Sequence, residues 1–126
     1  MDFYLDRASI IIRDGEVEFW DVVIFHQPTQ KDEPSGRLIK EKRTLRRADC
    51  MTQEQALLKG SSFDENGRLI EALTLSPGAI RRSSVRPGTI AASELYRACT
   101  EAGIEVPFAP PARALPAPPA EPHARP

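Results

Sequence analysis

Residues 9–25 carry the clearest alternation of apolar and polar positions in the chain. Ser9 to Arg13 is rich in β-branched isoleucine, the pair Asp14-Gly15 follows, and an apolar run resumes from Glu16 to Phe25. An Asp-Gly pair accepts positive φ and is typical of the tight turn between two antiparallel strands. The pattern therefore predicts a β-hairpin here.

The second arm of this hairpin is apolar on both faces near its middle. Alternation divides it into two sets: Val17, Phe19, Val23 and Phe25 on one face, and Trp20, Val22 and Ile24 on the other. A strand that is apolar on both sides is typical of the interior of a sheet. We expect this arm to be a central strand.

Further extended segments follow. Residues 27–36 contain two prolines and a glycine and predict a loop, which leads into an extended run over residues 37–50. Residues 53–63 and 68–75 flank the turn sequence 64–67 and predict a second hairpin. The piece 53–59 also has acceptable helix propensity, so a helical alternative stays open there.

One helix is predicted near the end of the domain. Thr89 is a suitable N-cap, the helical pattern runs from Ile90 to Ala102, and Gly103 supplies the stop. Helical spacing gathers one stripe of mostly small residues: Ala91, Leu95, Ala98, Cys99 and Ala102. Such a stripe lets a helix lie close to a sheet. The predicted fold class is α+β, a single antiparallel sheet of about five strands packed against one C-terminal helix.

Residues 105–126 form a segment of different composition. They hold eight of the twelve prolines and many alanines. Proline lacks an amide donor and has a fixed φ, so this segment cannot enter a sheet interior. We predict a domain over residues 1–104 and a disordered, proline- and alanine-rich tail over residues 105–126, either a solvated spacer or a ligand for a proline-recognising partner.

Composition narrows the class of protein. A length of 126 residues fits one domain, and 40% hydrophobic with 28% charged residues is ordinary for a globular chain. A net charge of -1 argues against a dedicated nucleic-acid binder, and no apolar run is long enough to span a bilayer. The first residues show no secretory signal. An exported segment with a new Met1, a misassigned start and a protein that stays inside the cell all remain open.

A basic run lies between residues 37 and 47. It contains six basic residues and one acid, and alternation places Lys40, Lys42 and Arg46 on one face and Arg43 and Arg47 on the other. Charge on both faces predicts an edge strand, where it would discourage edge-to-edge aggregation. The functional alternative is a binding surface made by Lys40, Lys42, Arg43, Arg46 and Arg47 for acidic polysaccharide, matrix protein or a lipid surface. Nucleic acid fits less well, because no aromatic residues interleave with the charges.

Other candidate chemistry is sparse. The acidic residues Asp14, Glu16, Glu18 and Asp21 favour solubility or pairing with the basic run, and their spacing matches no known metal loop. His26 is the one histidine before the tail, so a thiol nucleophile pairing Cys50 with His26 is the weakest interpretation. No phosphate loop or nucleophile elbow is present. We predict no catalysis, no cofactor and no metal.

Several spaced residues resemble the surface-adhesin protein E family. They are Tyr4-Leu5-Asp6, Ser9-Ile10, Gly15, Trp20, Asp49-Cys50, Pro87-Gly88-Thr89 and Cys99, and the likeness covers about residues 3–100. The family's members are small exported bacterial proteins with an antiparallel sheet, a C-terminal helix and a disulfide joining the two. The resemblance implies a fold more firmly than a function.

The resemblance also implies a Cys50–Cys99 disulfide, which suits one cysteine at a strand end and one on the helix stripe. The alternative is a pair of buried free thiols in a cytosolic relative. The chain departs from the family's usual pattern in three places. A strand before Tyr4 is absent, so the sheet is expected to lack an edge strand or the chain to be truncated. Arginines stand before Pro87 where tryptophan is common, and Thr89 replaces serine.

The resulting prediction is a non-catalytic module of the periplasm or cell surface that binds extracellular-matrix or acidic macromolecules through a basic edge. The alternative is a structural protein of the envelope or the cytoplasm without adhesin activity. Ligand identity and oligomeric state are not predicted.

Overall fold

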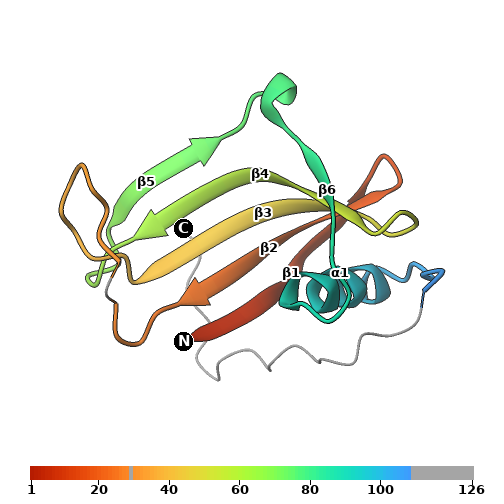
Figure 1. Cartoon of the computed structure of the whole chain (residues 1–126), viewed down its shortest axis with the longest axis horizontal. Coiled ribbons are helices and arrows are strands. Elements are labelled where there is room, and N and C mark those ends of the chain that lie inside the picture. The colour runs from red at the N-terminus through yellow and green to blue at the C-terminus, as the bar shows by residue number, and fades with distance from the viewer. Residues whose placement is uncertain (29, 109–126) are drawn as a thin grey trace.

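The fold is a curved antiparallel sheet with one helix against part of one face (Figure 1). The computed structural model describes residues 1–28 and 30–108. The elements follow in the order β1 (Asp2–Arg13), β2 (Glu16–Ile24), β3 (Glu41–Asp49), β4 (Glu54–Phe63), β5 (Leu69–Thr74), a 3-10 turn (Pro77–Ala79), β6 (Arg82–Ser84) and α1 (Ile90–Glu101).

Within the described residues, the sheet has six strands. Its main path is β1-β2-β3-β4-β5, with every neighbouring pair antiparallel, and the short β6 pairs with the beginning of β4. Both predicted hairpins are confirmed, and residues 53–59 lie in a strand region rather than a helix. β2 lies between β1 and β3, as its apolar faces predict.

Two differences concern strand extent. β1 begins at Asp2, seven residues before the predicted arm at Ser9, and a register shift between Asp6 and Ile11 interrupts its pairing with β2. Ser9 stabilises this irregular stretch, because its hydroxyl donates to Asp6 O and accepts from Trp20 N. β6 falls in the arginine-rich stretch before Pro87, for which the sequence predicts no strand. Its three residues are too few to show alternation.

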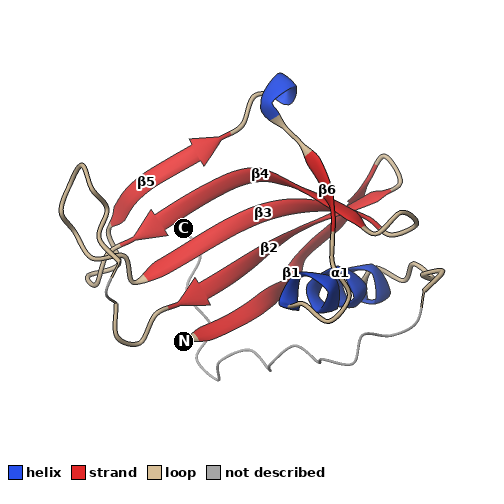
Figure 2. Cartoon of the chain, in the orientation of Figure 1, coloured by secondary structure: helices blue, strands red, loops and turns tan. Residues whose placement is uncertain are grey.

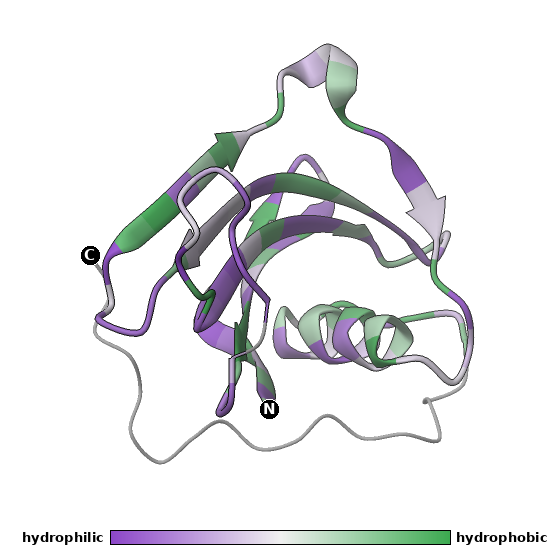
Figure 3. Cartoon of the chain, turned by 60° about the vertical axis from the view of Figure 1, so that its left-hand side comes forward, coloured by the Kyte–Doolittle hydropathy of each residue, from purple (hydrophilic) through white to green (hydrophobic). Residues whose placement is uncertain are grey.

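α1 covers one part of one sheet face (Figure 2). Its main contacts with the sheet are with β1, β2 and β3. The main core lies between them and includes Leu5, Val17 and Phe19 from the sheet and Leu95 and Ala98 from the helix. Figure 3 shows from the side that the helix lies below one part of the curved sheet while β5 extends beyond it.

Local signals set the ends of α1 where the sequence predicts them. Thr89 is the N-cap, with extended backbone, and its hydroxyl accepts a hydrogen bond from Ala92 N at 3.2 Å. Gly103 follows with φ of 79°, a conformation that glycine adopts without the penalty of a Cβ. Local interactions at Thr89 and Gly103 therefore define both ends of the helix without tertiary contacts.

Residues 104–108 follow α1 and pack against the domain. Ile104, Val106 and Phe108 pack against the main core, and the ring of Phe108 meets Tyr96 edge-on with centroids 6.0 Å apart. The predicted tail begins at residue 105, so its first residues contact α1. Its remainder, residues 109–126, lies outside the described residues.

Candidate binding surface

The basic run forms an interior strand, so the predicted edge position is wrong. Arg43, Arg46 and Arg47 lie on β3, which pairs with β2 on one side and β4 on the other. Interior placement is possible because acidic side chains on β2 and on β3 itself compensate the arginines. Protection of a sheet edge therefore does not explain these charges.

Two of the arginines are neutralised on the face that α1 leaves bare. Arg47 Nη2 lies 2.7 Å from Glu18 Oε2, and Arg13 also reaches that carboxylate at 3.5 Å. Arg43 forms an ion pair with Glu41, two residues earlier on the same strand. The predicted pairing of the acidic hairpin with the basic run is thus confirmed for Glu18.

The third arginine joins a buried acidic pair between the sheet and the helix. Arg46 Nε donates to Asp21 Oδ2 at 2.6 Å and lies 3.6 Å from Glu94 Oε1. Asp21 and Glu94 are each only 1% exposed. This cluster lies beside the main core and ties β2, β3 and α1 together.

One arginine cannot balance two buried carboxylates, and the pKa of Glu94 reflects this. Burial, and then the neighbouring Asp21 carboxylate, raises that pKa to about 10, whereas Arg46 opposes the rise. Glu94 is therefore a neutral acid at pH 7. Its Oε2 atom is buried with no hydrogen-bond partner.

The two lysines of the basic run form fewer hydrogen bonds and ion pairs than its arginines. Lys40 Nζ donates a long hydrogen bond of 3.4 Å to His26 O, and among the described residues Lys42 takes part in no ion pair. Lys42 lies on β3 four residues before Arg46, so alternation places it on the face that carries α1. Because α1 does not extend over β4 and β5, this part of the face is open.

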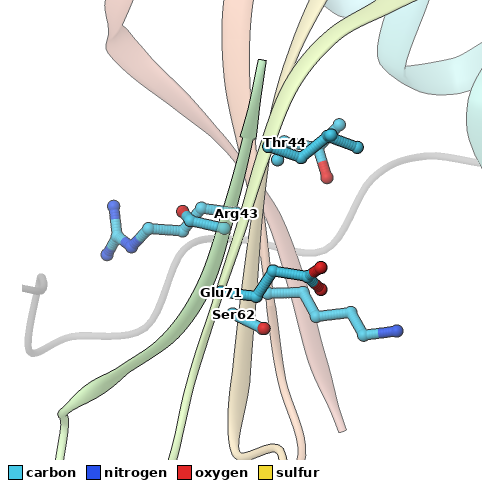
Figure 4. Close-up of a pocket in the computed structure, with 8 residues that line it drawn as sticks. Arg43, Thr44, Ser62 and Glu71 are labelled. Carbon is cyan, nitrogen blue, oxygen red and sulfur yellow. The ribbon is translucent and has the colours of Figure 1, made fainter. Parts of the chain in front are cut away.

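A hollow of about 170 Å³ lies on the open part of the helix-bearing face. The register of β3, β4 and β5 aligns its floor in two rows across the sheet, and these rows are Thr44, Gly60 and Leu73, and Lys42, Ser62 and Glu71. Figure 4 shows Thr44, Ser62 and Glu71 on one side of the strands and Arg43 on the opposite side. Lys42 therefore lies on the side of the hollow, whereas Arg43, which also lines it, directs its side chain to the opposite side of the strands.

Gly60 lines the floor of the hollow. A Cβ at this position would meet no atom closer than Arg43 O at 3.9 Å, so neither its backbone nor its surroundings require glycine. The missing side chain leaves space between Thr44 and Leu73. Glycine within a strand often marks a bulge or a place where another molecule approaches closely, and the register shift between β3 and β4 lies next to Gly60.

A disulfide fixes α1 at its place on the sheet. Cys50 and Cys99 are bonded, with their Cα atoms 5.9 Å apart and both side chains buried. The cysteine pair is therefore a crosslink, and the interpretation of Cys50 as a thiol nucleophile paired with His26 is wrong. His26 instead lies beside Asp2, with Nε2 3.2 Å from Oδ1.

Two further features of the described residues bear on function. Within residues 1–28 and 30–108, no group of three or more His, Cys, Asp or Glu side chains could hold a metal ion. None of the helices in the described part of the chain has the length and apolar character needed to cross a membrane.

Sequence reasoning missed Glu94 and the hollow. Glu94 lies three residues after Ala91 and four before Ala98, so helical spacing places it on the predicted buried stripe and signals a need for a partner. The hollow depends on the register among three strands, and only the lone Gly60 within a strand hinted at it.

Comparisons with known proteins agree with this architecture. The family described as surface-adhesin protein E matches residues 1–100. Crystal form II of Haemophilus influenzae protein E is similar in structure, with a TM-score of 0.62 and 18% identity over 81% of this chain and 83% of that one. Protein E from non-typeable Haemophilus influenzae has a TM-score of 0.54 and 19% identity over 79% and 67% of the two chains. Among curated proteins no match is found.

Proposed function

Because the chain belongs to the surface-adhesin protein E family, we propose that it is a non-catalytic binding module of the bacterial periplasm or cell surface. Its partners are extracellular-matrix or other acidic macromolecules. The disulfide supports an oxidising compartment, since structural disulfides persist mainly in exported proteins.

The observation that carries this proposal is the open half of the helix-bearing face. There the hollow presents Lys42, which forms no ion pair within 4.0 Å with any acidic side chain among the described residues, although Glu71 lines the same hollow. Lys40 precedes it by two residues, with one weak hydrogen bond to a main-chain oxygen. Positive charge that is not internally paired is available to an acidic partner.

The three arginines contribute differently. Arg43, Arg46 and Arg47 are held by Glu41, Asp21 and Glu18, so their charges are largely used within the fold. We assign them the role of supporting the binding strand, and Lys40 and Lys42 the direct contact. This divides the five predicted binding residues into two groups that mutation can separate.

Surface plasmon resonance with immobilised heparin and a basement-membrane matrix preparation tests the proposal. The double variant K40Q/K42Q is expected to bind at least tenfold more weakly than the wild type, with a reduced salt dependence. The matched control is K31Q/K59Q, which removes the same charge elsewhere and is expected to leave binding unchanged. Equal binding by the wild type and K40Q/K42Q would refute this surface, and no binding by the wild type to either probe would favour the alternative of a structural envelope protein.

A further inference from the structure

We propose that the hollow on β3, β4 and β5 binds one uronic acid residue of an unsulfated acidic polysaccharide. This inference rests on the proposed binding function and names the chemical class of its ligand. It is carried by the charges, the hydroxyl groups and the position of the hollow within the sheet.

The charges in the hollow call for a ligand that is only mildly acidic. Lys42 supplies one ammonium group and Glu71 one carboxylate, and no ion pair within 4.0 Å joins them to each other or to other described residues. A carboxylate of the ligand would pair with Lys42 as a charge-assisted contact. A polysulfated chain such as heparin can pair with Lys40 and Lys42, but it fits the hollow itself less well, because Glu71 would repel its additional charges.

The remaining polar groups suit a ligand rich in hydroxyls. Thr44 and Ser62 offer hydroxyl groups that both donate and accept, and Glu71 accepts only. A sugar ring carries hydroxyls of both kinds, so each of these side chains finds a complementary partner. Leu73, which is 48% exposed, and the bare backbone at Gly60 provide an apolar surface for the C–H face of the ring.

A peptide is less suited to this position. An extended peptide usually binds by adding a strand to a sheet edge, where main-chain groups are free. The floor of the hollow consists of three strands already paired with one another, so recognition there depends on side chains. The volume of about 170 Å³ is below the roughly 300–1,000 Å³ typical of sites for drug-sized ligands, and it fits a single ring.

Isothermal titration calorimetry with the full-length, disulfide-bonded protein tests the assignment. The probe is a tetrasaccharide of alternating glucuronate and N-acetylglucosamine, compared with the same tetrasaccharide after reduction of its carboxyl groups and with a short polyglutamate peptide. The carboxyl-reduced sugar is expected to bind at least tenfold more weakly than the tetrasaccharide, and polyglutamate to bind no better than the reduced sugar.

Two variants locate the site. K42Q is expected to lower affinity for the tetrasaccharide about tenfold. G60V, whose Cβ would meet no atom closer than Arg43 O at 3.9 Å, is expected to fill the hollow and abolish binding. K59Q is the control, because Lys59 pairs with Leu45 and its side chain lies on the opposite face. Circular dichroism confirms that each variant is folded, and a smaller substitution, G60A, replaces G60V if the larger one fails to fold.

The outcomes separate this inference from the proposed function. If the tetrasaccharide does not bind, or if polyglutamate binds as tightly, the uronic acid assignment is wrong. The proposed function still stands in that case when K40Q/K42Q weakens binding to matrix. If neither the tetrasaccharide nor the matrix preparation responds to the lysine substitutions, both proposals fail.

Discussion

Glu94 is the buried side chain through which α1 meets the charged strand β3, and its burial has an energetic cost. Its carboxyl group lies against Asp21 and near Arg46, in a space that water does not reach. Removing two ionised carboxylates from water has a large unfavourable desolvation free energy, and one guanidinium offsets only part of it. Holding Glu94 neutral avoids the second buried charge.

This arrangement predicts that stability falls as pH rises. The pKa of Glu94 is about 10 in the folded protein and near its usual value of 4.5 when unfolded. Between these values the folded state keeps a proton that the unfolded state releases, so the contribution of Glu94 is complete below pH 4.5 and is lost progressively toward pH 10. Urea unfolding at pH 6, 7.5 and 9 should show this decline.

The variant E94Q isolates the effect, because glutamine mimics the neutral acid and does not titrate. Relative to E94Q, the wild type is expected to lose up to about 1 kcal/mol of unfolding free energy per pH unit over this range. Other ionisable groups cancel in the difference. Parallel pH curves for the two proteins would show that Glu94 is ionised in the fold.

Asp64 illustrates the opposite shift. Its side chain accepts a hydrogen bond from Arg37 and others from the backbone amides of Arg68 and Asn66, and these lower its pKa. The resulting stabilisation is present above pH 3.8 and is lost as pH falls through the lowered pKa. D64N should therefore lower the thermal midpoint by a few degrees at pH 7 and by much less at pH 2. R37Q is the matched test of the ion pair, and additive effects of D64N and R37Q would contradict a shared interaction.

At the level of elements, α1 is attached by a cap, a buried cluster and a covalent bond. The sequence separation of Cys50 and Cys99 is 49. In the chain-entropy model, a loop of this length stabilises the fold by about 4 kcal/mol by restricting the unfolded chain. That contribution is large for a domain whose total stability is typically about 5–15 kcal/mol.

Replacing both cysteines with alanine should therefore lower the free energy of unfolding by about 4 kcal/mol. Denaturant unfolding of the double variant C50A/C99A, beside the oxidised and the chemically reduced wild type, measures this effect. The reduced protein and the double variant are expected to agree with each other. A loss below about 1 kcal/mol would mean that contacts other than the disulfide hold the helix.

The elements with strong local signals were predictable from sequence, and the relations among them were not. The turn at Asp14-Gly15 and the cap at Thr89 act within a few residues, so both features were identified. The interior position of β3 depends on Glu18 and Asp21, far away in sequence, and on Glu94 in α1. A pattern within one segment cannot reveal such partners, so the basic run was assigned to an edge.

The candidate site likewise contains one residue that the sequence alone suggests and others that only the structure brings together. Lys42 is predictable as a candidate binding residue, because its charge is visible in the sequence. Thr44, Ser62 and Glu71 are ordinary residues in isolation, and they become a site only through the register of three strands. Register is set by turns and bulges together, including a shift between Leu45 and Arg46 in the pairing of β3 with β4, and no single motif encodes it.

At the level of the whole molecule, helix and sheet share one core. Leu95 from α1 and Phe19 and Val17 from β2 are all fully buried in the same cluster. Without α1, the sheet would expose these side chains, and without the sheet the 12-residue helix would be too short to be stable in water. The domain should therefore unfold as one unit.

The variant L95A tests this expectation with two independent probes. Trp20, the only tryptophan, lies on β2 on the face opposite Phe19, so its fluorescence reports on the sheet, while far-UV circular dichroism reports on α1. Removing a fully buried leucine side chain should cost about 2–5 kcal/mol and should move both transitions to the same lower denaturant concentration. The exposed substitution L69A is the control and should move neither by more than a small amount. If the Trp20 transition stayed in place while the helical signal shifted, the sheet would be a separate folding unit. The proposed binding face would then not depend on the helix beside it.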